Sequence, residues 1–274
     1  MAKHPGLSVR KAVSAYLVQL ENKLAKSVKT SRSHAAHLFV GFGDSATVSD
    51  AQVQNYIEHR RANLAKPATI NRELEILRTT WNQACPGNGV TFPKLRENNV
   101  RQGFFTKEEV HRMVSVMHGA IADAVLFAFY TGWRKSEVFG LTWPMVQEVG
   151  GGGQAIYLPD TKNGRGRVVP VYGPLVGILK RAWNRRIADN PYVFTNGGAQ
   201  LKDISTVWKS ACKWANLEGR LFHDLRRSAA RNLIDAGVDR QVAKQITGHL
   251  TDSCFTRYQI VSQDQMRTAL EKVG

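Results

Sequence analysis

The chain has 274 residues, 43% of them hydrophobic, and its 38 Lys and Arg outnumber its 22 Asp and Glu to give a formal net charge of +16. This length and apolar content predict one or two folded domains and exclude general disorder. Both halves are basic, with 14 Lys and Arg against 7 Asp and Glu in residues 1–100 and 24 against 15 in residues 101–274. Such an even surplus predicts a polyanion, first of all nucleic acid, bound by the whole chain. An inert basic surface is the alternative.

Several other classes of protein are excluded by what the sequence lacks. The first residues hold no apolar signal-peptide core and no stretch reaches about 18 apolar residues, so we expect a cytoplasmic protein without a membrane span. Cys85, Cys212 and Cys254 are odd in number and far apart. This pattern fits reduced thiols rather than a disulfide framework or a zinc site. No pair of carboxylates has the spacing of metal ligands, so no metal is expected.

The first hundred residues carry the signals of a small helical domain. Apolar residues at helical spacing predict helices over residues 8–25, 30–40, 49–61 and 67–85. Ser49 with Gln52 forms a capping box, and Pro67 suits the first turn of its helix. We place this all-α domain at 1–97 and a linker, in a region rich in Asn and Gly, at 98–103. The polar helix faces carry candidate contacts to a DNA groove, with an ordinary solvated face as the alternative: Lys29, Arg32, Asn71, Arg72 and Arg78. The sequence does not indicate which helix would enter the groove.

The remaining residues, 104–274, mix helices with short strands. A capping box at Thr106 and Glu109 begins a helix, and the nearly all-apolar stretch 120–130 predicts a buried one. Short β-prone runs at 145–149, 155–158 and 168–171, separated by turns rich in Gly, predict a small antiparallel sheet. Further helices are expected over 174–189, 204–216, the region after 222 and 263–273, with a short strand at 192–194. The predicted fold class is therefore mainly α with a small antiparallel β-sheet (α+β).

This second half also holds residues suited to nucleophilic phosphoryl transfer. His223 and Arg226 are three apart, so on a helix they share one face. Arg offers a planar fork of donors to two phosphate oxygens, His exchanges a proton near neutral pH, and Tyr258 has a hydroxyl that can form an aryl phosphate ester. Arg134 follows the buried helix directly, with Glu137 three residues later. Each feature also has a structural reading: a solvated His-x-x-Arg face, a packed Tyr, or an Arg–Glu pair that only stabilises the fold.

Taken in order, these motifs resemble the tyrosine recombinase (phage integrase) family. The matching segments are Thr131-Gly-Trp-Arg134-Lys-Ser-Glu137 with Leu141-Thr-Trp143, then Thr161-Lys162 with Val168-Val-Pro170, His223-Asp-Leu-Arg226, Gly248-His249 and Thr256-Arg-Tyr258. The resemblance is strong over 105–274, and the segment 7–97 is similar to the family's core-binding domain. One departure is Thr247, where the family usually has Leu; we expect it to touch no catalytic role.

The resemblance implies both a mechanism and a set of catalytic residues. Tyr258 would attack the scissile phosphate to form a 3′-phosphotyrosyl link, and Arg134 and Arg226 would hold the non-bridging oxygens. Lys162 would protonate the leaving 5′ oxygen, His223 would accept the Tyr258 proton and His249 would hydrogen-bond the phosphate. Glu137 would support Arg134 and His223 without reacting.

The resemblance also implies partners and leaves alternatives open. Neither metal nor ATP would be needed. The partners would be a double-stranded core site with inverted half-sites, three further copies of the chain in a tetramer that passes through a Holliday junction, and possible accessory DNA-bending or directionality factors. The function would be integration or excision of a phage or mobile element. A type IB topoisomerase or telomere resolvase would use the same chemistry, and a regulator could keep the fold without catalysis. A metal nuclease is a third class, without a supporting motif.

Overall fold

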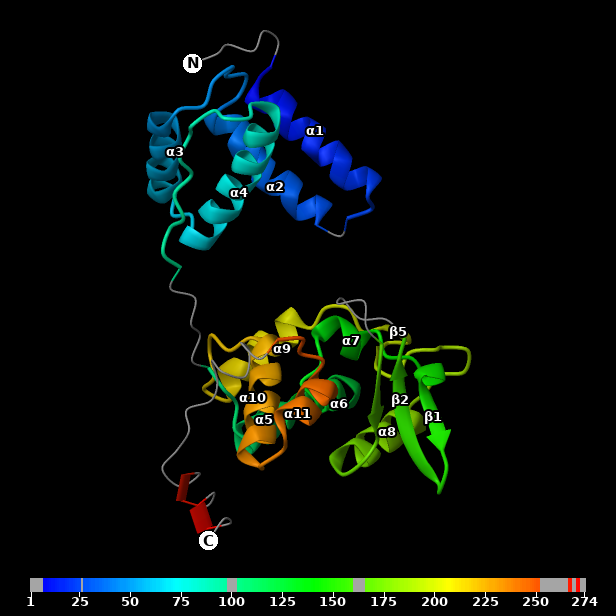
Figure 1. Cartoon of the computed structure of the whole chain (residues 1–274). Helices are drawn as coiled ribbons and strands as arrows, with labels where there is room; N and C mark the ends of the chain where they lie inside the picture. The colour runs from blue at the N-terminus through cyan, green and yellow to red at the C-terminus, as the bar shows by residue number, and fades with distance from the viewer. Residues whose placement is uncertain are drawn as a thin grey trace. The chain divides into compact units, whose positions relative to one another are not determined.

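The chain forms two compact units in the computed structural model, Met1–Arg101 and Gln102–Gly274 (Figure 1). The structure describes residues 7–25, 27–97, 103–159, 166–251, 266–267 and 270–271. The division between the units falls within the predicted linker at 98–103, of which the structure describes only residue 103. The first unit is called the N-terminal unit below, and the second the C-terminal unit.

The described part of the N-terminal unit contains four helices, as predicted. They are α1 (Val9–Asn22), α2 (Val28–Gly41), α3 (Asp50–Ala62) and α4 (Pro67–Ala84). The predicted capping box of Ser49 and Gln52 starts α3, and α4 packs against the other three helices around an apolar core. Within that core the carboxylate of Glu73 accepts hydrogen bonds from Tyr56 at 2.8 Å and from both Nε and Nη2 of Arg60. This buried acid is therefore satisfied by the fold.

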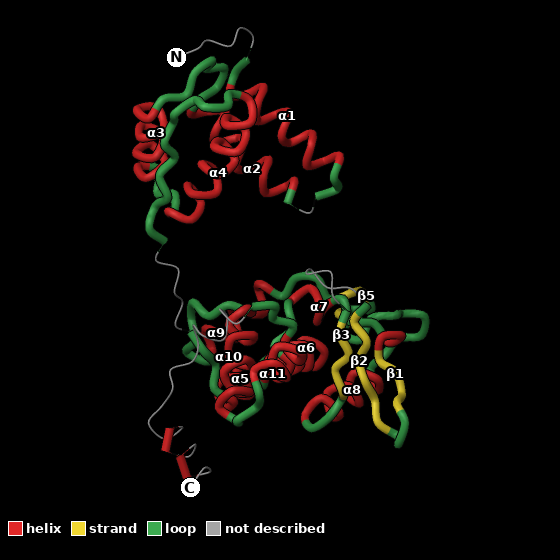
Figure 2. The backbone as a smooth tube through the Cα atoms, viewed as in Figure 1, coloured by secondary structure: helices red, strands yellow, loops and turns green. Residues whose placement is uncertain are grey.

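The C-terminal unit is mostly helical, with a small sheet at its edge (Figure 2). Its helices are α5 (Lys107–Val114), α6 (Gly119–Thr131), α7 (Lys135–Phe139), α8 (Pro174–Asn184), α9 (Ser205–Trp214), α10 (Phe222–Asp235) and α11 (Arg240–Thr247), with a 3₁₀ turn η1 (Trp143–Met145). The predicted buried helix is α6, which contacts α5, α8 and α10. Because α10 packs directly on α6, residues at the end of one helix are brought close to residues at the start of the other.

The sheet confirms the predicted antiparallel arrangement and with it the fold class. Strands β1 (Val146–Val149), β2 (Gly153–Leu158) and β3 (Arg167–Pro170) pair in the order β1-β2-β3. Leu158 is the partner of Arg167, so Arg167 stands at the base of the β2–β3 connection. A Cβ on Gly166 would lie within 3.0 Å of the carbonyl oxygens of Leu158 and Pro159, so the chain can pass here only as Gly.

Two expectations about the elements were wrong in detail. The strand predicted at 192–194 is absent: Tyr192 makes only an isolated bridge with Thr142, and the backbone N–H of Val193 donates to the Leu141 carbonyl. A two-residue strand, β4 (Thr195–Asn196), follows and pairs with β5 (Ala199–Gln200). The helix predicted to 189 ends at 184, where the backbone N–H of Arg185 donates to the carbonyls of Ala182 and Trp183; the Arg185 side chain pairs with Asp123 on α6. Most of the terminal helix predicted at 263–273 lies outside the described residues.

Two further sequence expectations concern thiols and membranes. Cys85 and Cys212 are buried free thiols, and Cys254 lies outside the described residues. Within the ranges that the structure describes, no helix is long and apolar enough to cross a membrane.

Candidate active site

The site is built on two helix ends that each require glycine. Gly132 caps the C-terminal end of helix α6 and Gly248 caps that of helix α11, with φ angles of 66° and 70°. This left-handed conformation is the usual helix ending at glycine and is strained for other residues. A Cβ on Gly132 would also lie 2.9 Å from Cβ of Ala229 and 3.0 Å from Cγ2 of Thr247. The backbone therefore approaches closely, and the carbonyls at the two helix ends face a common centre.

Arg226 reaches that centre from α10 and is almost completely buried. Its Nη1 donates to the carbonyl of Gly132 at 2.6 Å and to the carbonyl of Thr247, and its Nη2 donates to the carbonyl of Gly248 at 3.2 Å. The C-terminal end of a helix carries partial negative charge, which favours a cation. The two helix ends thus compensate for removing the guanidinium from water and fix its plane.

Arg134 meets Arg226 at the same carbonyl. Its Nη2 donates to the Gly248 oxygen at 3.3 Å, and its Nη1 donates to Oε1 of Glu137 at 2.8 Å. Glu137 Oε2 in turn accepts from the backbone N–H of Arg134 at 3.0 Å. The predicted support of Arg134 by Glu137 is therefore confirmed. Among the described residues Glu137 makes no hydrogen bond to His223, so its support of His223 stays a prediction.

The second partner of Glu137 is Arg167, which sequence reasoning did not single out. Arg167 Nη2 donates to Glu137 Oε2 at 2.8 Å, and its guanidinium carbon lies 4.9 Å from the centre of the Trp133 ring. On β3 its neighbour Val168 is exposed while Arg167 and Val169 are buried. A charged residue on the inward face of an alternating strand was the available signal. Although burial raises the pKa of Glu137, hydrogen bonds from Arg167 and Arg134 outweigh it and lower the pKa overall.

The two histidines lie in the positive field of these arginines. Burial first, and then Arg226 and Arg134, lower the pKa of His249 to about 3. For His223, loss of hydration and the nearby Arg226 lower the pKa, even though the residue keeps contact with solvent. A lowered pKa favours the neutral form of both rings near pH 7. The Nδ1 atom of His249 lies 2.8 Å from Oγ1 of Thr247.

The structure thus brings together five of the seven residues proposed for catalysis and its support. Arg134, Glu137, His223, Arg226 and His249 come from the start of α7, from α10 and from the end of α11. Lys162 and Tyr258 lie outside the described residues. Among the described side chains, no group of three or more His, Cys, Asp or Glu is arranged to hold a metal ion.

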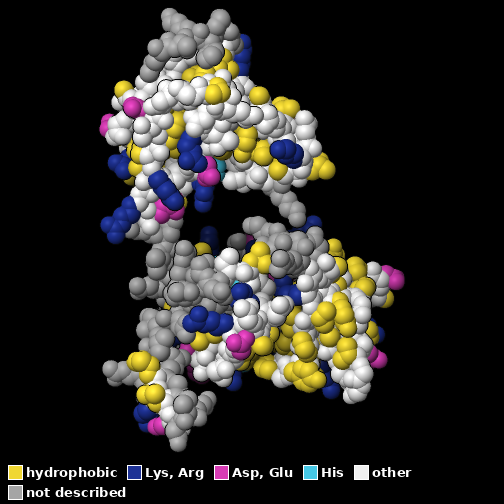
Figure 3. Space-filling view, viewed as in Figure 1, with side chains coloured by type: hydrophobic (Ala, Val, Ile, Leu, Met, Phe, Trp, Pro, Cys, Tyr) yellow, Lys and Arg dark blue, Asp and Glu magenta, His cyan; other side chains and the backbone are white. Residues whose placement is uncertain are grey.

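The predicted DNA-contacting residues lie on α2 and α4 of the N-terminal unit. On α2, Lys29 is exposed and Arg32 pairs with Glu21 at 2.7 Å. On α4, Arg72 pairs with Glu75 at 2.9 Å and both stay exposed. These surface pairs are weak, so a phosphate can replace the carboxylate. Figure 3 shows Lys and Arg side chains on this unit with fewer Asp and Glu among them.

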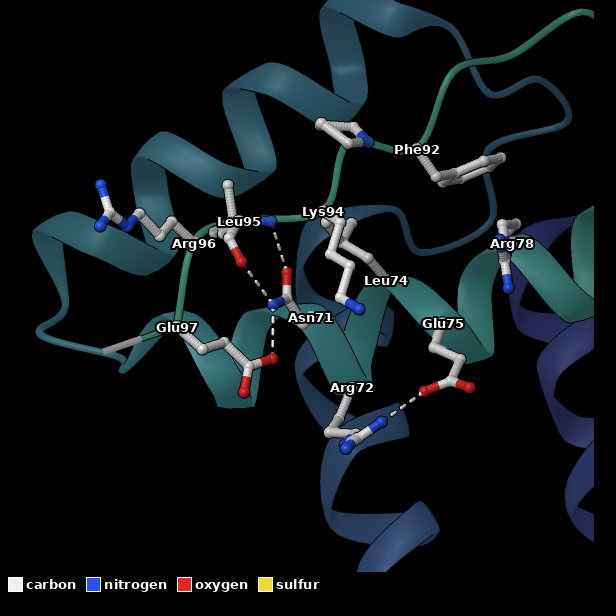
Figure 4. Close-up of a pocket in the computed structure, with 11 residues that line it drawn as sticks. Asn71, Arg72, Leu74, Glu75, Arg78, Phe92, Lys94, Leu95, Arg96 and Glu97 are labelled. Atoms are coloured by element: carbon white, nitrogen blue, oxygen red, sulfur yellow. Dashed lines mark hydrogen bonds and ion pairs between the residues drawn. The ribbon is translucent and has the colours of Figure 1, made fainter. Parts of the chain in front are cut away.

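A hollow of about 610 Å³ lies between α4 and the segment that follows it. Asn71 fastens this segment, because its side chain donates to the Leu95 carbonyl and to Glu97 and accepts from the Leu95 N–H. Its amide is therefore engaged within the unit, which gives Asn71 a structural role that the sequence did not indicate. Arg78, Lys94 and Arg96 also line the hollow (Figure 4). The last two cations were overlooked because their segment has no helical or strand pattern.

Comparison with known proteins relates this chain to one family. The model of the phage integrase family matches residues 103–265. Tyrosine recombinase XerA of Pyrococcus furiosus is 25% identical over 262 residues, covering 91% of this chain and 89% of that protein. A putative integrase/recombinase of Haemophilus influenzae is 31% identical over 212 residues, covering 70% of this chain and 55% of that protein.

Solved structures show the same fold at low sequence identity. The Tn1549 transposon integrase in complex with circular intermediate DNA has a TM-score of 0.75 at 16% identity, covering 97% of this chain and 99% of that one. A lambda integrase tetramer bound to a Holliday junction has a TM-score of 0.73 at 16% identity, covering 90% of this chain and 79% of that one.

Proposed function

This chain belongs to the phage integrase family and is a site-specific DNA recombinase, and we propose that it breaks and rejoins duplex DNA through a covalent 3′-phosphotyrosyl intermediate on Tyr258. The proposal assigns Lys162 and Tyr258 from their place in the motif order. It assigns Arg134, Arg226, His223 and His249 from that order and from their common location in the structure.

The observation that carries the proposal is the meeting of Arg134 and Arg226 at the Gly248 carbonyl. Arg167 is the third arginine near this carbonyl. Glu137 contributes one negative charge to the cluster, through its contacts with Arg134 and Arg167. The described part of this cluster therefore has net positive charge. A phosphodiester would add an anion to this centre, and guanidinium groups match two phosphate oxygens. Fixed donors aimed at oxygens that gain charge in the transition state are the strongest form of electrostatic catalysis.

The remaining residues would move protons. As the Tyr258 oxygen forms its bond to phosphorus, the bond from phosphorus to the 5′ oxygen breaks. The Tyr258 proton would pass to His223, whose lowered pKa keeps it neutral and able to accept. Lys162 would give a proton to the leaving 5′ oxygen, and His249 would donate a hydrogen bond to the phosphate. Because the phosphotyrosyl ester retains the energy of the broken bond, rejoining would need neither ATP nor metal.

We further propose that the chain acts in the cytoplasm on a core site with inverted half-sites, where four copies pair two duplexes. The support is the fold shared with the lambda integrase tetramer bound to a Holliday junction. The N-terminal unit would contact DNA through α2 and α4. Accessory bending or directionality factors would complete the system for integration or excision of a phage or mobile element.

The test uses a nicked suicide substrate that carries the candidate core site, with EDTA present. We expect a covalent protein–DNA band on a denaturing gel for the wild type and none for Tyr258→Phe at equal DNA occupancy. Arg226→Ala should bind DNA but form the adduct at least 100-fold more slowly, by analogy with the loss of an oxyanion donor. An adduct that persists in Tyr258→Phe would refute the nucleophile. Dependence on added Mg²⁺ would favour a metal nuclease.

A further inference from the structure

Thr247 lies between two of the residues assigned to catalysis. It is fully buried at the end of α11. Its backbone carbonyl accepts from Arg226, and its side-chain Oγ1 lies 2.8 Å from Nδ1 of His249. The same Oγ1 donates to the Ala243 carbonyl at 2.7 Å. The sequence offered no reason to expect a catalytic role for this residue, yet it contacts two residues assigned to catalysis.

A hydroxyl can serve Nδ1 in more than one protonation state, because it is both donor and acceptor. If Oγ1 donates to the Ala243 carbonyl, it can accept from an Nδ1–H, and Nε2 then carries a proton only in the charged ring. If it donates to Nδ1 instead, the Ala243 carbonyl still has the amide partner that an α-helix provides. Nδ1 thus has a partner both in the charged ring and in the neutral ring that carries its proton on Nε2. In both of these forms Nε2 has a proton to donate.

We propose that Thr247 is a positioning residue whose hydroxyl turns from the Ala243 carbonyl to donate to Nδ1 of the neutral His249 ring. The ring proton then stays on Nε2, and Nε2–H donates to a non-bridging oxygen of the scissile phosphate. This inference rests on the proposed function, because it gives His249 a phosphate to contact. The partner of one imidazole nitrogen determines which nitrogen carries the proton. The contact at Nδ1 therefore determines whether Nε2 donates or accepts a hydrogen bond.

The surroundings make this contact matter. The groups that face His249 are Arg226 and His223 from α10, Arg134 from the start of α7 and Arg167 from β3, and they all disfavour a charged ring. A neutral ring has only one N–H, so its position determines whether His249 is a donor or an acceptor toward the phosphate. Neither a Leu nor a Val at position 247 could govern that position.

Two substitutions separate this role from simple packing. Thr247→Val keeps both branches at Cβ but removes the hydroxyl, whereas Thr247→Ser keeps the hydroxyl but removes Cγ2. That methyl group packs closely against Gly132. We expect the single-turnover rate of adduct formation on the suicide substrate to fall about tenfold in Thr247→Val, the size expected for one lost hydrogen bond. Thr247→Ser should stay within about threefold of the wild type.

Each variant is compared at saturating DNA, after its affinity and thermal stability have been measured. If Thr247 only packs, the order is reversed, with Thr247→Ser slow and Thr247→Val near the wild-type rate. Either that order or equal rates in the two variants would overturn the proposal. A second arm introduces Thr247→Val into His249→Ala, where we expect no further loss because the positioned ring is gone. A tenfold loss that persists in this background would also overturn it. If the wild type itself forms no adduct, the proposed function fails first, and the inference fails with it.

Discussion

Glu137 is the residue through which a small change should disturb the site most. Its carboxylate accepts three hydrogen bonds, two from Arg134 and one from Arg167. Glu137→Gln keeps the shape but removes the charge and turns one oxygen into an NH₂ donor that faces an arginine or an amide. At least one hydrogen bond from a charged group is lost, each worth about 1.5–3 kcal/mol. With two cations left less compensated, we expect the free energy of unfolding of the C-terminal unit to fall by roughly 2–4 kcal/mol at pH 7.

The stability that Glu137 contributes depends on pH. The pKa of Glu137 is lowered in the folded chain. A group of this kind contributes stability that is complete above its unfolded pKa, about 4.3, and is lost as pH falls through its lower folded pKa. The gap in stability between wild type and Glu137→Gln should therefore be full at pH 7 and smaller at pH 3.5.

The measurement is urea unfolding at both pH values, followed by tryptophan fluorescence, with adduct formation assayed in parallel. Asp235→Asn is the matched control, because Asp235 also pairs with an arginine of the C-terminal unit, Arg231, but on the exposed surface of α10. Exposed pairs contribute little, so we expect the control to lose less than about 1 kcal/mol. Equal losses in the two variants, or a gap that does not narrow in acid, would refute the reasoning.

Three other predictions concern single residues. The pKa of His249 is lowered to about 3 in the folded chain, so between that pH and about 6.5 the unfolded chain binds more protons than the folded one. At pH 5 the wild type should therefore lose about 2 kcal/mol of unfolding free energy, a loss that His249→Asn should not show. Urea unfolding midpoints at pH 7 and pH 5 measure this difference. Gly248→Ala should lower the unfolding free energy by about 1–2 kcal/mol, because the backbone here is left-handed. The added Cβ would also collide with the Arg167 guanidinium, so we expect adduct formation to slow far more than DNA binding weakens. An unchanged rate of adduct formation would contradict this. Arg78→Ala should lower the slope of log affinity against log salt by about 1 without changing the adduct rate at saturating DNA, and an unchanged slope would remove Arg78 from the interface.

The sequence predicted local features of the site well because local spacing determines them. Arg134 and Glu137 are three residues apart at the start of a helix, so their contact follows from helix geometry. The capping boxes at Ser49 and Thr106 follow from equally short patterns and are present in the structure. The antiparallel order of the sheet follows from short connections between its strands.

Long-range contacts could not be predicted in this way. Arg226 binds the Gly132 carbonyl across 94 residues of chain, and Arg134 binds that of Gly248 across 114. Both acceptors are backbone atoms, which every residue possesses, so no side-chain pattern reveals them. Arg167 and Thr247 were missed for a related reason: their importance comes from what they touch, Glu137 and His249, and not from a motif of their own.

Backbone carbonyls also explain how two like charges can be held ready for a phosphate. A carboxylate against each guanidinium would neutralise it and compete with the phosphate for its donors, whereas carbonyls stabilise the cation while leaving its net charge in place. The site applies both solutions: Glu137 orients Arg134, and the ends of α6 and α11 hold Arg226. Since the left-handed glycines fix those ends, the arrangement of donors exists before DNA arrives. Little reorganisation is then needed when charge develops on the phosphate, which is the condition under which electrostatic stabilisation is most effective.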